Sequence, residues 1–201
     1  MRKGELINTL VSLGILILVA FLFTKFLSFH EQRSNGLDMV FNDPFYHLLK
    51  PADLSILIFS ITYGSILLYT VMNFKTHGFA LRAFVCYAFL LLLRIPSLTL
   101  LPLKVHPELI YLKDPFLNEL VYPSRITNDL FFSGHVGLMC IFFLISRNRM
   151  VFLVLGIIVG ISLIIQRVHY SIDVLAAIPF GWLAVKLADL TIRRAGMARI
   201  E

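Results

Sequence analysis

Long apolar runs, separated by short polar breaks, repeat along the whole chain. Each run approaches the roughly 20 apolar residues that a helix needs to cross a bilayer. Lipid offers the backbone no hydrogen-bond partners, and a helix satisfies its own backbone groups within one segment. The pattern therefore predicts an all-α integral membrane protein, a bundle of six transmembrane helices with spans at roughly 7–29, 52–73, 79–103, 129–146, 150–166 and 169–189.

Composition favours a single membrane domain over residues 1–201. Of these residues, 58% are hydrophobic and 15% are charged, far from the balance of a soluble domain. Arg2 and Lys3 precede the first run as they would in a secretory signal. Its length of roughly 22 residues and the lack of a small-residue cleavage pattern predict a retained span instead. Cys86 and Cys140 fall inside predicted spans and give no disulfide framework.

The distribution of Lys and Arg predicts the orientation. With the amino terminus inside, more than half of the 18 Lys and Arg residues fall on inner tails and short inner loops, as the positive-inside rule requires. Both termini are then cytoplasmic. The net charge of +6 reflects this topology and contact with anionic lipid head groups. Without a soluble basic domain it gives no support to a nucleic-acid partner.

Two short histidine motifs lie where apolar runs meet water, Ser133-Gly134-His135 and His169-Tyr170-Ser171-Ile172-Asp173. In the predicted orientation both face the outer side. On a helix, residues four apart share a face, so Asp173 can accept a hydrogen bond from one ring nitrogen of His169 and leave the other as a nucleophile or base. His135 can then protonate a leaving oxygen. Either histidine alone can equally be an interfacial anchor, but ionisable residues inside a membrane are costly and by default functional.

The two motifs resemble those of a known enzyme family. Sphingomyelin synthases, which are relatives of the type 2 phosphatidic acid phosphatases or lipid phosphate phosphatases, carry paired catalytic motifs similar to Asp129-Leu130-Phe131-Phe132-Ser133-Gly134-His135 and His169-Tyr170-Ser171-Ile172-Asp173-Val174. A third-span segment of the synthases more weakly resembles Arg94-Ile95-Pro96-Ser97-Leu98-Thr99-Leu100-Leu101-Pro102. The resemblance implies that His169 attacks phosphorus to form a phosphohistidine, that Asp173 orients it, and that His135 protonates the leaving oxygen.

The candidate substrate-binding residues surround these motifs in the sequence. Phosphatase relatives usually carry a lysine ahead of an arginine-proline motif, and Tyr87 stands at that place here. They also carry an arginine six residues before the nucleophilic histidine, where this chain has Leu163. Other cations must therefore neutralise the developing negative charge. The residues that we expect to bind substrate are Arg94, Asp129, Ser133, Gly134, Arg125, Arg167 and Tyr170.

The sequence predicts a lipid phosphotransferase that moves a phosphoryl head group from a phospholipid donor to a lipid alcohol, with water as a competing acceptor. We expect its site on the periplasmic, exoplasmic or luminal side, and no metal or other cofactor, since no acidic cluster suited to divalent cations accompanies the histidines. Two alternatives stay open, a lipid phosphate phosphatase that hydrolyses such an ester and a non-catalytic lipid-binding membrane protein. A transporter is disfavoured because the sequence shows no inverted repeat and no interrupted pair of spans.

Overall fold

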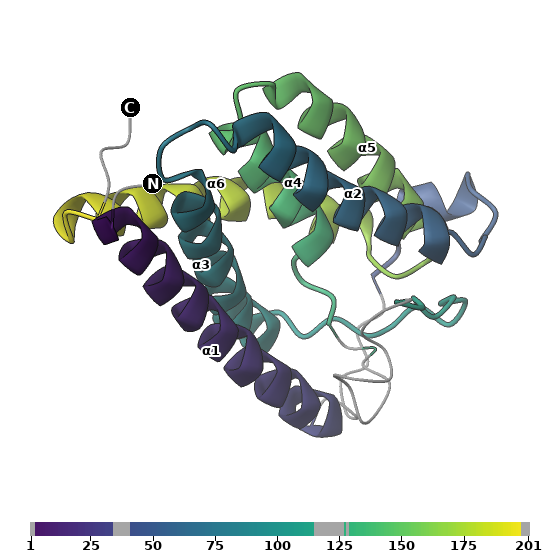
Figure 1. The fold of residues 1–201 in the computed structure, drawn as a ribbon. Helices are drawn as coiled ribbons and strands as arrows, with labels where there is room; N and C mark the ends of the chain where they lie inside the picture. The colour runs from purple at the N-terminus through teal and green to yellow at the C-terminus, as the bar shows by residue number, and fades with distance from the viewer. Residues whose placement is uncertain (1–2, 34–40, 115–126, 128, 198–201) are drawn as a thin grey trace.

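The computed structural model describes residues 3–33, 41–114, 127 and 129–197, and these residues form helices joined by loops, with no strand among them (Figure 1). The elements are α1 (Lys3–Arg33), the short 3-10 helix η1 (Pro44–His47), α2 (Ser55–Asn73), α3 (Phe79–Leu100), α4 (Gly134–Ile145), α5 (Arg149–Ile165) and α6 (Ser171–Arg194). The predicted all-α class is confirmed for this part of the chain.

Four of the described helices, α1, α2, α3 and α6, are long and apolar enough to cross a membrane. The other two are shorter, with 12 residues in α4 and 17 in α5. At about 1.5 Å per residue these helices measure about 18 and 26 Å, against a hydrocarbon core of about 30 Å. The lengths indicate a membrane protein. Of the six predicted spans, four coincide with a described helix that is long and apolar enough to cross a membrane, and the other two coincide with shorter helices.

Three helices begin later than the predicted spans: α2 begins at Ser55 instead of residue 52, and α4 and α6 begin later at the two motifs. The fourth span is expected from residue 129, but α4 begins at Gly134 because Ser133 is its N-cap, with extended backbone and a hydroxyl that accepts a hydrogen bond from the first turn. The sixth span is expected from residue 169, but α6 begins at Ser171 after the N-cap residue Tyr170. His169 therefore precedes the helix instead of lying on it.

The helices alternate in direction between two ends of the molecule. One end, which we call the terminal end, holds the start of α1, the α2–α3 turn, the α4–α5 turn and the end of α6. There Asn8 Nδ2 donates to the Met197 carbonyl at 3.0 Å, linking the first and last helices. Asn73 Nδ2 donates to Ser146 Oγ at 3.1 Å, linking the two turns. The opposite end, which we call the motif end, is made of residues 41–54, 101–114, 129–133 and 166–170.

The helix α4 lies at the centre and packs against α5, α6 and α3. In Figure 1, α2, α4 and α5 lie together, α1 lies along α3, and α6 passes behind both groups. Small residues allow the closest approaches, as is common between helices in membranes. A Cβ added at Gly160 of α5 would lie 2.9 Å from Val174 Cγ1 of α6. This packing brings the first turns of α4 and α6, which carry the motifs, together.

Candidate functional site

The two histidine motifs meet at the motif end, where a backbone hydrogen bond joins them. The Ser133 N–H donates to the Asp173 carbonyl at 3.2 Å, which holds the start of α4 against the first turn of α6. His135, in the first turn of α4, is half-buried with its ring edge-on to Phe59 of α2, at 5.7 Å between ring centroids. His169 is among the ionisable neighbours that act on His135. The fold thus brings the predicted catalytic residues together.

His169 and Asp173 are paired across a turn, which corrects the prediction that they share a helix face. His169 Nδ1 lies 3.5 Å from Asp173 Oδ2. The same oxygen accepts a hydrogen bond from the Tyr170 backbone N–H at 3.0 Å. Asp173 stands in the first turn of α6, where the helix dipole favours a negative charge. One carboxylate therefore both caps α6 and faces the imidazole.

Both members of this pair are buried, Asp173 with 0% of its surface exposed and His169 with 3%. His169 Nδ1 and Asp173 Oδ1 have no hydrogen-bond partner within the described residues. Their side chains approach at 3.5 Å, which exceeds the usual N–H···O range of about 2.7–3.2 Å. Catalytic hydrogen bonds are often long before substrate binds and tighten afterwards. With Nδ1 turned towards the carboxylate, Nε2 is the ring nitrogen left for chemistry.

Arg94 of α3 places a guanidinium beside the His135 turn. Arg94 is only 6% exposed, its Nη2 lies 2.5 Å from Asp129 Oδ1, and its Nε has no hydrogen-bond partner within the described residues. Gly134 makes room for it, because a Cβ there would lie 2.6 Å from Arg94 Nη1. The cation thus lies against the N-terminus of α4, where the helix dipole also favours an anion. The predicted binding residue Arg125 lies outside the described residues.

Arg167 and Tyr170, two further predicted binding residues, are engaged in contacts that hold the fold. Arg167 has a left-handed backbone, with φ 60°, and its Nη2 donates to the carbonyls of Tyr46 and Leu49 at 2.7 and 2.6 Å. Its guanidinium lies 4.1 Å from the centroid of the Tyr46 ring. The Tyr170 hydroxyl donates to the Lys104 carbonyl at 2.8 Å. A substrate could recruit either side chain only by displacing these contacts.

Asp43 and Tyr46, in the segment that follows α1, clamp the His169 segment. Asp43 is buried and accepts a hydrogen bond from the Ser171 N–H at the start of α6. The Tyr46 hydroxyl donates to the His169 carbonyl at 3.0 Å. Asp43 also caps η1, and an aspartate before a proline is a common helix start. That signal marks a short helix but gives no indication of what the helix contacts.

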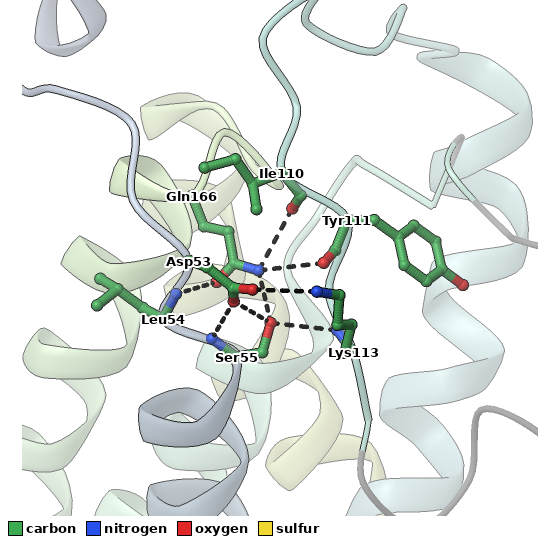
Figure 2. Close-up of polar contacts among 7 residues, drawn as sticks. All are labelled: Asp53, Leu54, Ser55, Ile110, Tyr111, Lys113 and Gln166. Atoms are coloured by element: carbon green, nitrogen blue, oxygen red, sulfur yellow. Dashed lines mark hydrogen bonds and ion pairs between the residues drawn. The ribbon is translucent and has the colours of Figure 1, made fainter.

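Gln166 ties three segments of the motif end together (Figure 2). Its amide is fully buried, and its Nε2 donates to Ser55 Oγ at 2.8 Å. Its Oε1 accepts a hydrogen bond from the Leu54 N–H at 3.0 Å. The carbonyls of Ile110 and Tyr111 lie 3.3 and 3.4 Å from Nε2. The end of α5, the start of α2 and the loop before residue 114 are therefore held as one unit.

Asp53 and His106, in the motif-end loops, have pKa values lowered by their surroundings. Asp53 Oδ1 accepts hydrogen bonds from Ser55 Oγ and N–H at 2.7 and 3.0 Å, which lower the pKa of its carboxyl. Lys113 Nζ lies 3.4 Å from the other carboxyl oxygen (Figure 2). Burial lowers the pKa of His106, whose Nδ1 accepts the Glu108 N–H at 3.1 Å. Both shifts preserve the loop contacts near neutral pH.

The site as a whole offers a nucleophilic imidazole, a carboxylate that orients it, a second imidazole and a cation. In the part of the chain that the structure describes, no three His, Cys, Asp or Glu side chains gather as metal ligands. Comparison of the chain with known protein families, characterised proteins and solved structures gave no match.

Proposed function

We propose that the chain is a membrane lipid phosphotransferase that moves a phosphoryl head group from a phospholipid to a lipid alcohol through a phosphohistidine on His169. The observation that carries the proposal is the buried His169–Asp173 pair, joined by the Ser133–Asp173 backbone bond to the turn that bears His135. Burying ionisable groups is costly, and such groups gather at functional sites. The resemblance of both motifs to those of sphingomyelin synthases supports the same chemistry.

The reaction proceeds in two displacements. In the first, His169 Nε2 attacks phosphorus, the bond from phosphorus to the leaving oxygen breaks, and His135 gives that oxygen its proton. Asp173 holds the proton on Nδ1 and offsets the charge that the imidazole gains. In the second, the acceptor hydroxyl oxygen attacks phosphorus, its proton passes to His135, and the phosphorus–nitrogen bond breaks. Each histidine returns to its starting protonation state.

Arg94 and the start of α4 stabilise the negative charge on the transferring group. The guanidinium lies against Gly134, and its Nε is without a hydrogen-bond partner within the described residues. The N-terminus of a helix adds backbone N–H donors and a favourable dipole. Preorganised donors of this kind typically contribute about 2.7–4 kcal/mol to transition-state binding. They take the place of the arginine that phosphatase relatives carry at the position where this chain has Leu163.

In this proposal all six helices cross the membrane, both termini are cytoplasmic, and the site faces the periplasm, the exoplasm or a lumen. The short α4 supports a site recessed from the surface. With Ser146 at the opposite boundary, about 18 Å of helix leaves the start of α4, and with it His135, roughly 12 Å inside a hydrocarbon core of about 30 Å. A recessed site favours lipid substrates, which can reach it from within the bilayer, over soluble phosphate esters.

The test is an assay of purified protein in lipid with a chelator present. Labelled phospholipid donors are incubated with increasing ceramide or diacylglycerol, and new phospholipid and released head-group phosphate are both measured. We expect transfer to rise with the acceptor while hydrolysis falls, and both to vanish in His169→Ala. Hydrolysis alone at saturating acceptor would identify a lipid phosphate phosphatase. No product from any donor, with lipid binding intact in His169→Ala, would identify a non-catalytic lipid-binding protein.

A further inference from the structure

An apolar groove of about 570 Å³ runs along α4 between α5 and α6. Residues on its rim are widely exposed, with 53% for Ile157 on α5, 63% for Leu175 and 51% for Trp182 on α6. Met139 and Cys140 of α4 line the groove between the α5 wall and the α6 wall. In a protein that spans a bilayer, such exposed apolar walls face lipid.

The groove is separate from the candidate site. It uses the side of α4 that bears Val136, Met139, Cys140 and Phe143, a helical stripe. His135 is turned towards Phe59 of α2 instead. Gly160 packs against Val174 and Val136 at the motif end of the groove, so the walls converge there.

The length of the groove matches one leaflet. Along α5 it extends from Phe152 to Ile164, which are twelve residues apart, or about 18 Å. Half of a hydrocarbon core is about 15 Å. The groove therefore covers the depth of one acyl chain that enters from the terminal end.

Two cations stand at the terminal end of the groove. Lys186 lies one turn beyond Trp182 on the same face of α6, with its Nζ 5.5 Å from the centroid of the indole ring. Arg149 is the first residue of α5 and shares a helix face with Leu153 of the groove wall. Both cations are exposed. The nearby acidic residue Asp189 pairs with Arg82 at 2.8 Å. Its carboxylate is therefore neutralised by Arg82, and it leaves the positive charges of Arg149 and Lys186 in place.

We propose that this groove binds an anionic phospholipid of the leaflet at the terminal end. One acyl chain lies along α4 between α5 and α6, and the phosphate lies at the terminal end of the groove, where Arg149 on one wall and Lys186 on the other each make the surface more positive. Near a membrane surface, each such cation strengthens binding of an anionic lipid by about five-fold. The proposal requires that the chain span a membrane but not that it transfer phosphate, so the two proposals fail separately.

Trp182 is the single tryptophan of the chain and reports directly on the occupant. The full chain is placed in vesicles that contain phosphatidylglycerol or phosphatidylcholine with bromine at mid-chain. Bromine quenches indole fluorescence on contact, and each measurement is divided by that with the unbrominated lipid. We expect the phosphatidylglycerol to quench at a lower mole fraction than the phosphatidylcholine.

Charge variants identify the head-group site. Arg149→Gln and Lys186→Gln should each reduce the preference for phosphatidylglycerol about five-fold, and together they should abolish it. Lys75→Gln, which removes an exposed cation from the α2–α3 turn at the same end, should leave the preference unchanged. Equal quenching by both lipids, or a preference that survives in the double variant, would overturn the proposal. Absence of quenching by either lipid would show that another apolar surface, such as a second copy, covers the groove.

Discussion

At the scale of single residues, the backbone around His169 is held at three successive positions. The His169 carbonyl accepts the Tyr46 hydroxyl, the Tyr170 N–H donates to Asp173, and the Ser171 N–H donates to Asp43. The imidazole therefore has little freedom beyond rotation of its own side chain. Fixing a nucleophile before the substrate arrives removes much of the entropy cost of reaction. The proposed chemistry thus depends on residues that never touch phosphorus.

Asp173→Asn should retain the fold and lose most of the activity. The amide oxygen can still accept the Tyr170 N–H, but the side chain no longer offsets the imidazolium charge or selects the tautomer of His169. In a serine protease the equivalent change lowers kcat about 10⁴-fold. The measurements are the turnover number and the amount of acid-labile phosphoenzyme that forms. Trapped phosphate on His135 instead of His169 would show that His169 is not the nucleophile. Near wild-type turnover in Asp173→Asn would show that Asp173 has no role in the reaction.

Gly134→Ala should lower activity far more than stability. The added Cβ would meet Arg94 Nη1 at 2.6 Å, and the end of a long side chain can move aside at small cost, which shifts the cation away from the start of α4. Gly64→Ala is the matched control, because a Cβ there meets nothing within 4 Å. We expect the rate of transfer to fall about 10²-fold or more in Gly134→Ala and to stay unchanged in Gly64→Ala. The thermal unfolding temperatures of the two variants should be similar. Equal activities would argue against Arg94 as the anion-binding cation.

A pH effect is expected at His106. Its Nδ1 accepts the Glu108 N–H, its ring lies edge-on to Tyr46, and burial lowers its pKa from the ordinary 6.5. Because the folded protein binds this proton less tightly than the unfolded chain, the stabilisation is complete above about pH 6.5 and is lost as pH falls through the folded pKa. Proteolysis of residues 101–114 should therefore accelerate on acidification. His106→Phe keeps a ring without the proton, and it should flatten this pH dependence.

At the scale of elements, polar ties between loops fix the motif end. Gln166→Leu would leave the Leu54 N–H and the carbonyls of Ile110 and Tyr111 without their partner. A fully buried group that loses its partner costs about 1–3 kcal/mol, and each of these half-buried groups should cost less than that. We expect a clearly lower Tm and faster cleavage within residues 101–114. Ser162→Ala is the control, since Ser162 Oγ donates only to the Ile158 carbonyl within α5, and an unchanged Tm in Gln166→Leu would contradict this account.

The same elements show what the sequence can predict. A span must be apolar over its whole length, so the runs locate the helices, and the motifs are recognisable because their residues are neighbours in sequence. The starts of α4 and α6 escape such prediction because the caps around Ser133 and Asp173 decide them. The contacts of Asp43 and Gln166 escape prediction entirely, since their partners lie 128 and 111 residues away. No local pattern encodes a contact of that range.

At the scale of the whole molecule, the two ends differ in both structure and charge. The motif end is built from long loops held by polar side-chain networks, whereas the terminal end has short turns and the groove cations Arg149 and Lys186. Positive charge on short loops favours the cytoplasmic side of a membrane. The proposed chemistry at one end and the proposed anionic-lipid site at the other are what a protein that acts on lipids of the outer leaflet would need.

This two-ended arrangement predicts the labelling pattern of single cysteines. In a background with Cys86→Ala and Cys140→Ala, an impermeant maleimide added to intact cells should label Lys50→Cys at the motif end. It should label Lys75→Cys and Arg147→Cys, both exposed at the terminal end, only after the membrane is opened.

The three cysteine positions distinguish orientation from membrane placement. Opened membranes provide the control, because all three positions should then react and the cysteine-free parent should not. The reverse pattern would overturn the charge-based orientation while leaving a membrane between the two ends. Labelling of Lys50→Cys and Lys75→Cys from the same side would be more serious, because α2, which joins them, would then not cross the membrane. The proposed recessed site would lose its basis in that case, since the depth of His135 follows only from helices that span the bilayer between these ends.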